Sequence, residues 1–261
     1  MHWLMISLAA PRASFAGPAP GGIRGTERAP TRSALLGLVA AALGIKQSDS
    51  EGHRTLSDTL AFATRVEQDG ALELDYHTTQ VGKKTDLKKR VLYTRHDELD
   101  LPRSVLSTIL SERSYRCDYR ASTAICSTQG DKAQLEAIQQ ALRKPKWTLY
   151  LGRKCAALAW PLAPVLIEAP DWQAALAQFD SQREAEREKW RSHTAGKALW
   201  WPLKRETGRH NRTLHSVDFA LANYAKADGQ RVVFRRTEVL DRARKLYCDT
   251  RVIEFEEHAH G

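Results

Sequence analysis

The pattern of apolar and polar positions at the start of the chain predicts a buried strand. Over residues 3–10 both alternating sets of positions are largely apolar, which is typical of a central strand that is covered on both faces. The Gly/Pro-rich segment 11–30 follows, and a long loop of this kind inside a compact domain is usually functional. A helix is expected next, because Thr31 or Ser33 can cap its start and Gly44 stands where a terminating glycine belongs.

Strand and helix patterns alternate along the rest of the chain. Helices are expected at 55–60, at 132–144 and at 172–190, and strands at 61–66, 71–77, 115–119, 121–126, 164–167, 231–234 and 246–255. The pair Asp69-Gly70 predicts a hairpin turn between the strands at 61–66 and 71–77. The order strand, helix, hairpin, strand, helix favours an α+β fold whose sheet carries its helices on one face.

Composition narrows the class of protein. The 261 residues suffice for one large domain or two small ones, and 40 Lys+Arg against 31 Asp+Glu give a net charge of +9. This basic balance favours a polyanionic partner, either nucleic acid or an anionic membrane surface. The four cysteines form no C-x-x-C pair, so we interpret them as reduced, mostly buried thiols. No apolar run approaches the roughly 18 residues of a membrane span, and we expect a cytoplasmic protein.

Known catalytic and cofactor motifs are absent from the sequence. It contains no dinucleotide-binding glycine motif, P-loop, zinc-protease helix or nucleophile elbow, so no cofactor is expected. His210 and His215 stand five residues apart in a basic stretch, which is a poor spacing for metal ligands, and no metal site is expected.

Cations grouped with aromatic residues and glycines are the distinctive feature of the chain. They occur at 24–32, just before the expected helix, at Tyr76-His77, in the basic run 81–95, and at 147–154. Phosphates are bound by Lys, Arg and helix N-termini, and the bases of single-stranded RNA stack on aromatic rings and guanidinium planes. Each segment alone is compatible with an ordinary loop, sheet pair, solvated face or turn. All four in one basic chain favour nucleic-acid binding.

Several of these segments resemble a known family. Residues 30–38, Pro-Thr-Arg-Ser-Ala-Leu-Leu-Gly-Leu, resemble the first-helix signature of the CasD type of the fifth Cas protein family, found in the type I-E CRISPR effector Cascade. Three further segments agree in order and spacing: Leu-Ala-Ala-Pro at 8–11, Asp-Tyr-His-Thr at 75–78, and Lys-Pro-Lys-Trp-Thr-Leu-Tyr-Leu-Gly-Arg-Lys at 144–154. The resemblance covers residues 1–180 well and the remainder poorly.

The resemblance implies a fold and a function. The fold is an α+β, ferredoxin-like or RRM-like RAMP core over residues 1–180, with an extended β-hairpin thumb at about 80–113. A smaller C-terminal part, 181–261, then holds a basic insertion at 181–213 and the last strands. The function is that of a non-catalytic Cascade subunit that binds and caps the 5′ handle of crRNA in antiviral defence. Its partners would be the handle, the Cascade backbone and large subunits, and target DNA through the assembled complex.

The same resemblance implies the RNA contacts. Arg24, Arg28 and Arg32 would approach handle phosphates, Tyr150 and Arg153 would contact handle bases, and thumb cations would hold the RNA backbone. The complete expected set is Arg24, Arg28, Arg32, Ser33, Tyr76, His77, Lys83, Lys84, Lys88, Lys89, Arg90, Arg95, Trp147, Tyr150, Gly152, Arg153 and Lys154.

Two alternatives stay open. Relatives in another subtype cleave precursor crRNA without metal, and Tyr76, His77 and Lys83 or Lys84 provide the residue types for such an endoribonuclease. Type I-E members carry the same Asp-Tyr-His-Thr segment and leave processing to a separate subunit, so we expect binding without catalysis. The other alternative is a basic RNA- or ribosome-binding protein outside CRISPR systems.

Overall fold

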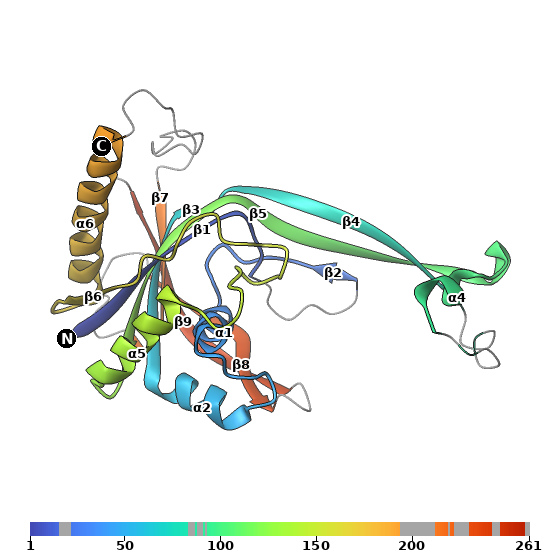
Figure 1. The fold of residues 1–261 in the computed structure, drawn as a ribbon, viewed down its shortest axis with the longest axis horizontal. Coiled ribbons are helices and arrows are strands. Elements are labelled where there is room, and N and C mark those ends of the chain that lie inside the picture. Colours follow the sequence, from blue (N-terminus) through green and yellow to red (C-terminus); the bar gives the residue numbers. More distant parts are fainter. Residues whose placement is uncertain are drawn as a thin grey trace.

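One large, mostly antiparallel sheet organises the protein (Figure 1). The computed structural model describes residues 1–15, 22–82, 87, 91, 93–193, 212–218, 220–221, 230–241 and 246–258. The strands are β1 (His2–Ala13), β2 (Ile23–Arg24), β3 (Leu60–Gln68), β4 (Ala71–Gly82), β5 (Leu106–Ser127), β6 (Val165–Glu168), β7 (Arg212–Asp218), β8 (Arg231–Asp241) and β9 (Leu246–His258). The helices are α1 (Arg32–Leu43), α2 (Ser50–Thr59), α4 (Arg95–Leu99), the short 3-10 helix η1 (Arg103–Val105), α5 (Lys132–Arg143) and α6 (Trp172–His193).

The first two thirds of the chain form a ferredoxin-like core. In chain order its elements are β1, α1, β3, β5, α5 and β6, and in the sheet its strands lie in the order β6-β1-β5-β3, every neighbouring pair antiparallel. This arrangement confirms the expected α+β fold with a ferredoxin-like core. β1 is the central strand that the apolar pattern predicted, since it pairs with β5 on one side and with β6 on the other.

Helices cover both faces of the sheet, so the expectation of helices on one face was wrong. Leu4 and Ile6 on β1 are buried in the same cluster as the apolar residues of α1 and α5. Trp3 and Met5 point to the opposite face, where they pack with Trp172 and other residues of α6 (Figure 1). The physical reason is the sequence of β1 itself, because a strand that is apolar on both faces needs a cover on each.

The thumb is a long two-stranded ribbon that projects away from the core (Figure 1). β4 pairs with the first half of β5 from Ala71↔Cys117 out to Gly82↔Leu106, and α4 lies at the outer end. The extended hairpin is therefore confirmed, but its paired strands begin nearer the core than the expected 80–113.

The hairpin turn expected at Asp69-Gly70 was wrong. β3 and β4 follow one another along the same partner, because β5 is a single 22-residue strand where two shorter strands were expected. The chain passes from β3 to β4 at Gly70, whose φ of +67° lies in the left-handed region that favours glycine. This is the point at which the thumb leaves the sheet.

Capping residues set the boundaries of the helices. Thr31 caps α1 by accepting a hydrogen bond from the Ala34 N–H at 3.3 Å, and Gly44 ends the helix with φ +78°. Asp131 caps α5 by accepting from the Gln134 N–H at 3.0 Å. α2 begins at Ser50, five residues before the expected start, because Asp49 supplies its cap. No described helix is both long enough and apolar enough to cross a membrane.

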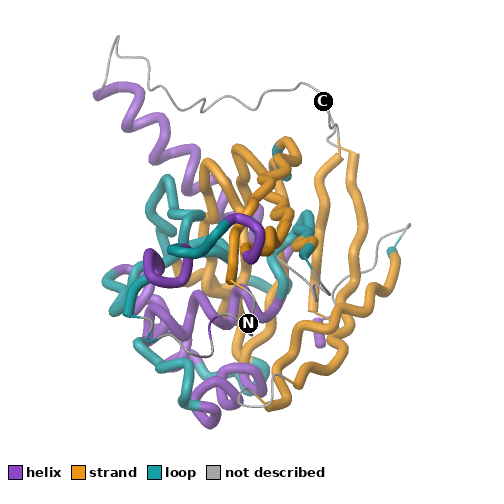
Figure 2. Tube along the Cα trace, turned by 90° about the vertical axis from the view of Figure 1, so that its right-hand side faces the viewer, coloured by secondary structure: helices purple, strands orange, loops and turns teal. Residues whose placement is uncertain are grey.

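The C-terminal strands extend the core sheet. β7, which the sequence pattern did not predict, pairs with β3, and β9 and β8 follow outward from it. Figure 2 shows the helices and strands of the molecule from the side towards which the thumb points. The expected insertion at 181–213 begins as the last turns of α6, and residues 194–211 lie outside the described part of the chain. The division into 1–180 and 181–261 stays a prediction.

Candidate nucleic-acid interface

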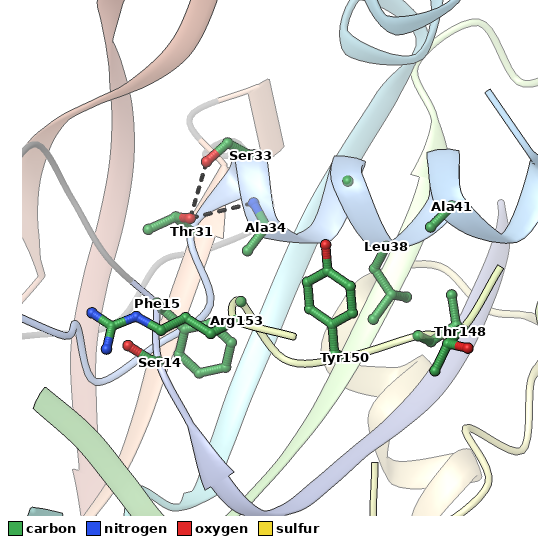
Figure 3. A pocket seen from close by; sticks show the side chains of 13 residues that line it. Ser14, Phe15, Thr31, Ser33, Ala34, Leu38, Ala41, Thr148, Tyr150 and Arg153 are labelled. Atoms are coloured by element: carbon green, nitrogen blue, oxygen red, sulfur yellow. Dashed lines mark hydrogen bonds between the residues drawn. The ribbon is translucent and has the colours of Figure 1, made fainter. Parts of the chain in front are cut away.

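A cavity of about 290 Å³ lies between one face of α1, from Ser33 to Ala41, and the loop 148–153 (Figure 3). It brings together two of the segments that the sequence analysis singled out, the start of the first helix and the Tyr-Leu-Gly-Arg loop. Its lining residues are Ser14, Phe15, Thr31, Ser33, Ala34, Gly37, Leu38, Ala41, Thr148, Leu149, Tyr150, Gly152 and Arg153.

Backbone contacts fix the loop against the end of β1. The Ser14 N–H donates to the Leu151 carbonyl at 3.1 Å, and the Leu151 N–H donates to the Ala156 carbonyl at 2.9 Å. Gly152 has φ +88°, and a Cβ at this position would lie 1.8 Å from the Ser14 carbonyl oxygen. The loop therefore requires glycine here, both for its backbone conformation and for its close approach to β1.

The start of α1 gives the cavity a positive electrostatic character. The first turn of α1 contains no acidic residue, so the partial positive charge of the helix N-terminus is not neutralised by its own side chains. Thr31 and Ser33 present hydroxyl groups there, 3.1 Å apart. Tyr150 lies between the loop and α1 (Figure 3). Aromatic, hydroxyl and positive groups thus meet in one place, which is the combination that binds nucleotides.

Arg153 connects this cavity to the base of the thumb. Its guanidinium lies 4.9 Å from the ring centre of Tyr115 and donates to the Arg24 carbonyl at 3.3 Å. Its Nη1 has no hydrogen-bond partner in the described structure. Arg12 lies over the same ring at 5.7 Å. The structure therefore places Arg153 against the backbone of Arg24 and adds Arg12 and Tyr115 to this group, while the expected RNA contacts of Arg24 and Arg153 stay predictions.

The sequence analysis missed Arg12 and Tyr115 as site residues. Both were visible as a cation and an aromatic ring, but they stand about a hundred residues apart in the chain. Only the register of β1 on β5, in which Arg12 faces Cys117, brings them close together. The contact between Arg12 and Tyr115 depends on how β1 and β5 pair, and no local sequence motif gives that pairing.

Arg32 is held inside the protein. Its guanidinium forms an ion pair with Asp218 on β7 and donates to the Leu60 carbonyl at 2.9 Å, and its side chain is 12% exposed. It also lies over the ring of Phe62 at 5.6 Å. These contacts tie the start of α1 to β3 and β7, which is a structural role; its expected contact with RNA stays a prediction.

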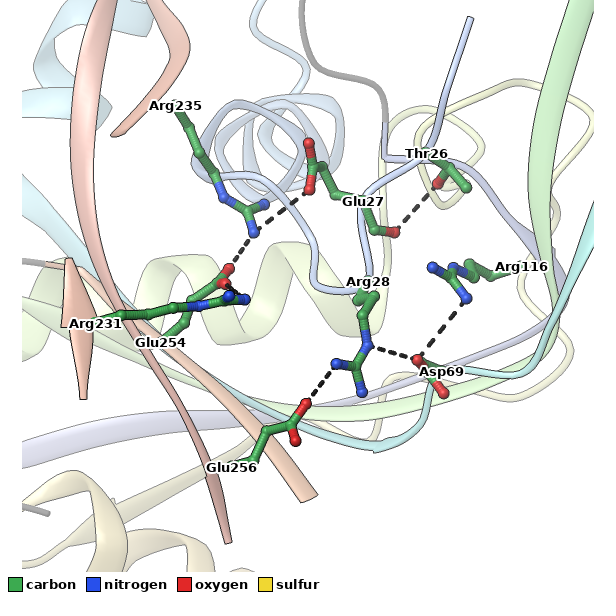
Figure 4. A network of polar contacts seen from close by, with 9 residues as sticks. All are labelled: Thr26, Glu27, Arg28, Asp69, Arg116, Arg231, Arg235, Glu254 and Glu256. Carbon is green, nitrogen blue, oxygen red and sulfur yellow. Dashed lines mark hydrogen bonds and ion pairs between the residues drawn. The ribbon is translucent and has the colours of Figure 1, made fainter. Parts of the chain in front are cut away.

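The guanidinium of Arg28 also forms ion pairs with carboxylates (Figure 4). Its Nε lies 2.7 Å from Asp69, and its Nη1 lies 2.5 Å from Glu256 on β9. Partial burial alone lowers the pKa of Arg28, but the hydrogen bonds to Glu256 and Asp69 raise the pKa above the ordinary arginine value. Its expected RNA contact likewise stays a prediction.

The thumb carries the next group of expected residues. Tyr76 is 62% exposed, whereas the His77 ring nitrogen lies 2.6 Å from the Asp75 carboxylate. Tyr76 and His77 are neighbours on one strand, so their side chains point to opposite faces of the ribbon. Arg95, near the tip, forms an ion pair with Glu98. The expected thumb cations Lys83, Lys84, Lys88, Lys89 and Arg90 lie outside the described residues.

The remaining expected residues lie in or beside the loop. Trp147 is 43% exposed, and Lys154 is exposed. In the part of the chain that the structure describes, no three His, Cys, Asp or Glu side chains gather in a way that could hold a metal ion. His215 is buried and stacks on Phe255, with 4.6 Å between ring centres, and His210 lies outside the described residues.

Comparison with known proteins gives the relationship. A family model described as CRISPR-associated protein (Cas_Cas5) matches residues 3–245. The chain belongs to the Cas5 family of CRISPR-associated proteins. The Cascade subunit CasD of Escherichia coli (strain K12) is 34% identical over 178 residues, which cover 68% of this chain and 77% of CasD.

Two solved structures share the fold of this Cas5-family chain. A chain of a CRISPR RNA-guided surveillance complex superposes with a TM-score of 0.60 at 23% identity, over 98% of this chain and 90% of the other. A crystal structure of a Cas protein superposes with a TM-score of 0.55 at 19% identity, over 98% and 94% of the two chains. At these identities the two structures support the fold.

Proposed function

We propose that this Cas5-family chain is a non-catalytic subunit of a type I-E Cascade effector, in which it binds and caps the 5′ handle of crRNA. The observation that carries the proposal is the cavity between α1 and the loop 148–153, which joins a helix N-terminus to Tyr150 and Arg153. Single-stranded RNA is held by this combination of phosphate-binding positive groups and stacking surfaces. The 34% identity to CasD, a Cascade subunit, supplies the biological setting.

The proposal includes partners and the absence of catalysis. Within the complex the neighbours would be the Cascade backbone and large subunits, and target DNA would be reached only through the assembled complex. Binding without cleavage is supported by the placement of Tyr76 and His77 on opposite faces of the thumb, because general acid–base chemistry needs both groups at one phosphate.

The test replaces Arg153 with alanine in the complex assembled with its partner subunits and a CRISPR array. Handle affinity is measured by filter binding of labelled crRNA, and we expect a loss of at least roughly tenfold, since a single stacking or charged contact is worth about 1–3 kcal/mol. The matched control is Arg143→Ala, an exposed arginine on α5 that donates a weak hydrogen bond to the Pro164 carbonyl at 3.4 Å. Equal affinities for the two variants would contradict the proposed site.

A further inference from the structure

The thumb leaves the sheet at a joint in the backbone. The pairing of β3 with β5 ends at Gln68↔Arg120, and the pairing of β4 with β5 starts at Ala71↔Cys117. On the two strands between these pairs, Gly70 has φ +67° and Asp118 has φ +56°. A non-glycine residue in the left-handed region is uncommon, and two such positions facing one another interrupt the ladder. The interruption lies on the β3 and β4 edge of β5, whereas on the other edge β5 pairs with β1 on both sides of Asp118, as far as Ala13↔Arg116. Beyond Arg116 the pairing with β1 no longer fixes the direction of the thumb.

A cluster of ion pairs lies at this joint (Figure 4). Asp69, next to Gly70, accepts from Arg28 Nε at 2.7 Å and lies 3.8 Å from Arg116 Nη1 on β5. Arg28 Nη1 in turn lies 2.5 Å from Glu256 on β9. The Asp69 side chain is only 13% exposed, so its interactions are weakly screened by water. We name Arg28, Asp69, Arg116 and Glu256 the root cluster.

We propose that the root cluster positions the thumb relative to the sheet. It connects three parts of the chain across the interrupted edge of the ladder: the segment before α1, the root of the thumb and the C-terminal strand β9. The thumb is a long lever, since the 12 residues of β4 span roughly 40 Å at about 3.4 Å per residue. A small rotation at the joint therefore moves the outer part of the thumb by several ångströms. The consequence for RNA rests on the proposed function.

The direction in which Asp69→Asn changes RNA affinity distinguishes a positioning role of the root cluster from a direct RNA contact of Arg28. If Arg28 were a phosphate ligand, Asp69→Asn would free a cation, remove a negative charge beside the RNA and strengthen binding. If the root cluster positions the thumb, the same substitution loosens the joint and weakens binding. Asn keeps the shape of Asp, and the four side chains of the root cluster lie outside the apolar clusters of the described core. Glu256→Gln, at the other end of the cluster, should act in the same direction.

The experiment measures thumb position and RNA affinity in the same proteins. Noncanonical amino acids that replace Thr79 and Gln140 carry spin labels. Double electron–electron resonance between these labels measures the thumb-to-core distance in the free chain. A rotation of about 10° shifts that distance by roughly 5 Å, given the eight residues of strand beyond Ala71. Handle affinity is measured in the assembled complex, where a loss of about five- to tenfold is expected. The matched control is Asp58→Asn, which removes a carboxylate paired with Arg54 on the exposed surface of α2, away from the thumb.

The outcomes separate the two proposals. A shifted or broadened distance distribution in Asp69→Asn and Glu256→Gln, with the Asp58→Asn distribution unchanged, supports positioning. Unchanged distance distributions overturn the positioning proposal. If the same variants also bind handle RNA more tightly, Arg28 is a direct RNA ligand. A shifted distribution with unchanged handle affinity supports positioning while contradicting the role of the thumb in the proposed function. Because the distance is measured in the free chain, it tests the positioning proposal even if the wild-type complex does not bind handle RNA.

Discussion

Replacement of Arg32 by alanine tests whether this arginine holds the fold or the RNA. The guanidinium pairs with Asp218, which also accepts a hydrogen bond from the Phe62 N–H at 2.9 Å. It donates as well to the carbonyls of Ser57 and Leu60, so one side chain joins α1, the end of α2, β3 and β7. The substitution removes all of these contacts at once.

The expected loss of stability follows from burial. The side chains of Arg32 and Asp218 are 12% and 9% exposed, so the pair belongs with buried ion pairs. Removal of one partner of such a pair typically costs about 3–5 kcal/mol, because the other charge keeps its desolvation penalty. For a chain of this size that corresponds to a fall in Tm of roughly 10 °C.

The assay is thermal unfolding followed by circular dichroism, in a double-mutant cycle with Asp218→Asn. Because the two side chains share one interaction, the double variant should be less destabilised than the sum of the single variants. Arg24→Ala is the control, since Arg24 is exposed and lies on the same segment before α1. An Arg32→Ala protein that unfolds at the wild-type temperature but loses handle RNA would refute this reasoning and assign Arg32 to the RNA.

Three further predictions concern other parts of the molecule. Gly152→Ala should lower stability by at least about 2 kcal/mol more than Gly130→Ala in urea unfolding, because both have positive φ but only at Gly152 would a Cβ meet a carbonyl oxygen. Alkylation at pH 8, followed by mass spectrometry, should modify the exposed Cys155 well before Cys117. Burial and the nearby Glu73 raise the pKa of Cys117 to about 11, so about a thousandth of Cys117 is thiolate at pH 8. Equal rates of modification would contradict this. Burial alone would raise the pKa of Glu67, but the charges of Arg65 and Arg183 outweigh it and hold this pKa below the ordinary value. The difference in unfolding free energy between the wild type and Glu67→Gln should therefore be full at pH 7 and shrink as the pH falls below about 4. A difference that does not change with pH would contradict this.

The sequence predicted those elements whose signals are local. The first strand, the caps at Thr31 and Asp131 and the terminating Gly44 depend on neighbouring residues, and all are found as predicted. The ferredoxin-like core and the thumb came from the family resemblance. The turn at Asp69-Gly70 was misread because a glycine with positive φ serves a joint between collinear strands as well as a hairpin, and only the length of β5 decides between them.

The candidate site could be predicted in part for the same reason. The loop at Tyr150 and Arg153 carries its own motif, and the structure places it against the start of α1. The roles of Arg28 and Arg32 were hidden, because their carboxylate partners Glu256 and Asp218 lie about two hundred residues away in strands beyond the core. A run of arginines in a sequence gives their charge and leaves open which of them face inward.

Sequencing of the RNA that copurifies with the chain tests the central claim most directly. The chain is co-expressed with its neighbouring genes and a CRISPR array, and its RNA contacts are fixed by ultraviolet cross-linking. Uniform RNAs with one repeat-derived 5′ end, cross-linked to this chain through that end, are the predicted result. A heterogeneous mixture of cellular RNA would contradict the handle-binding function, and uniform processed RNAs formed with this chain as the sole Cas protein would identify it as a nuclease.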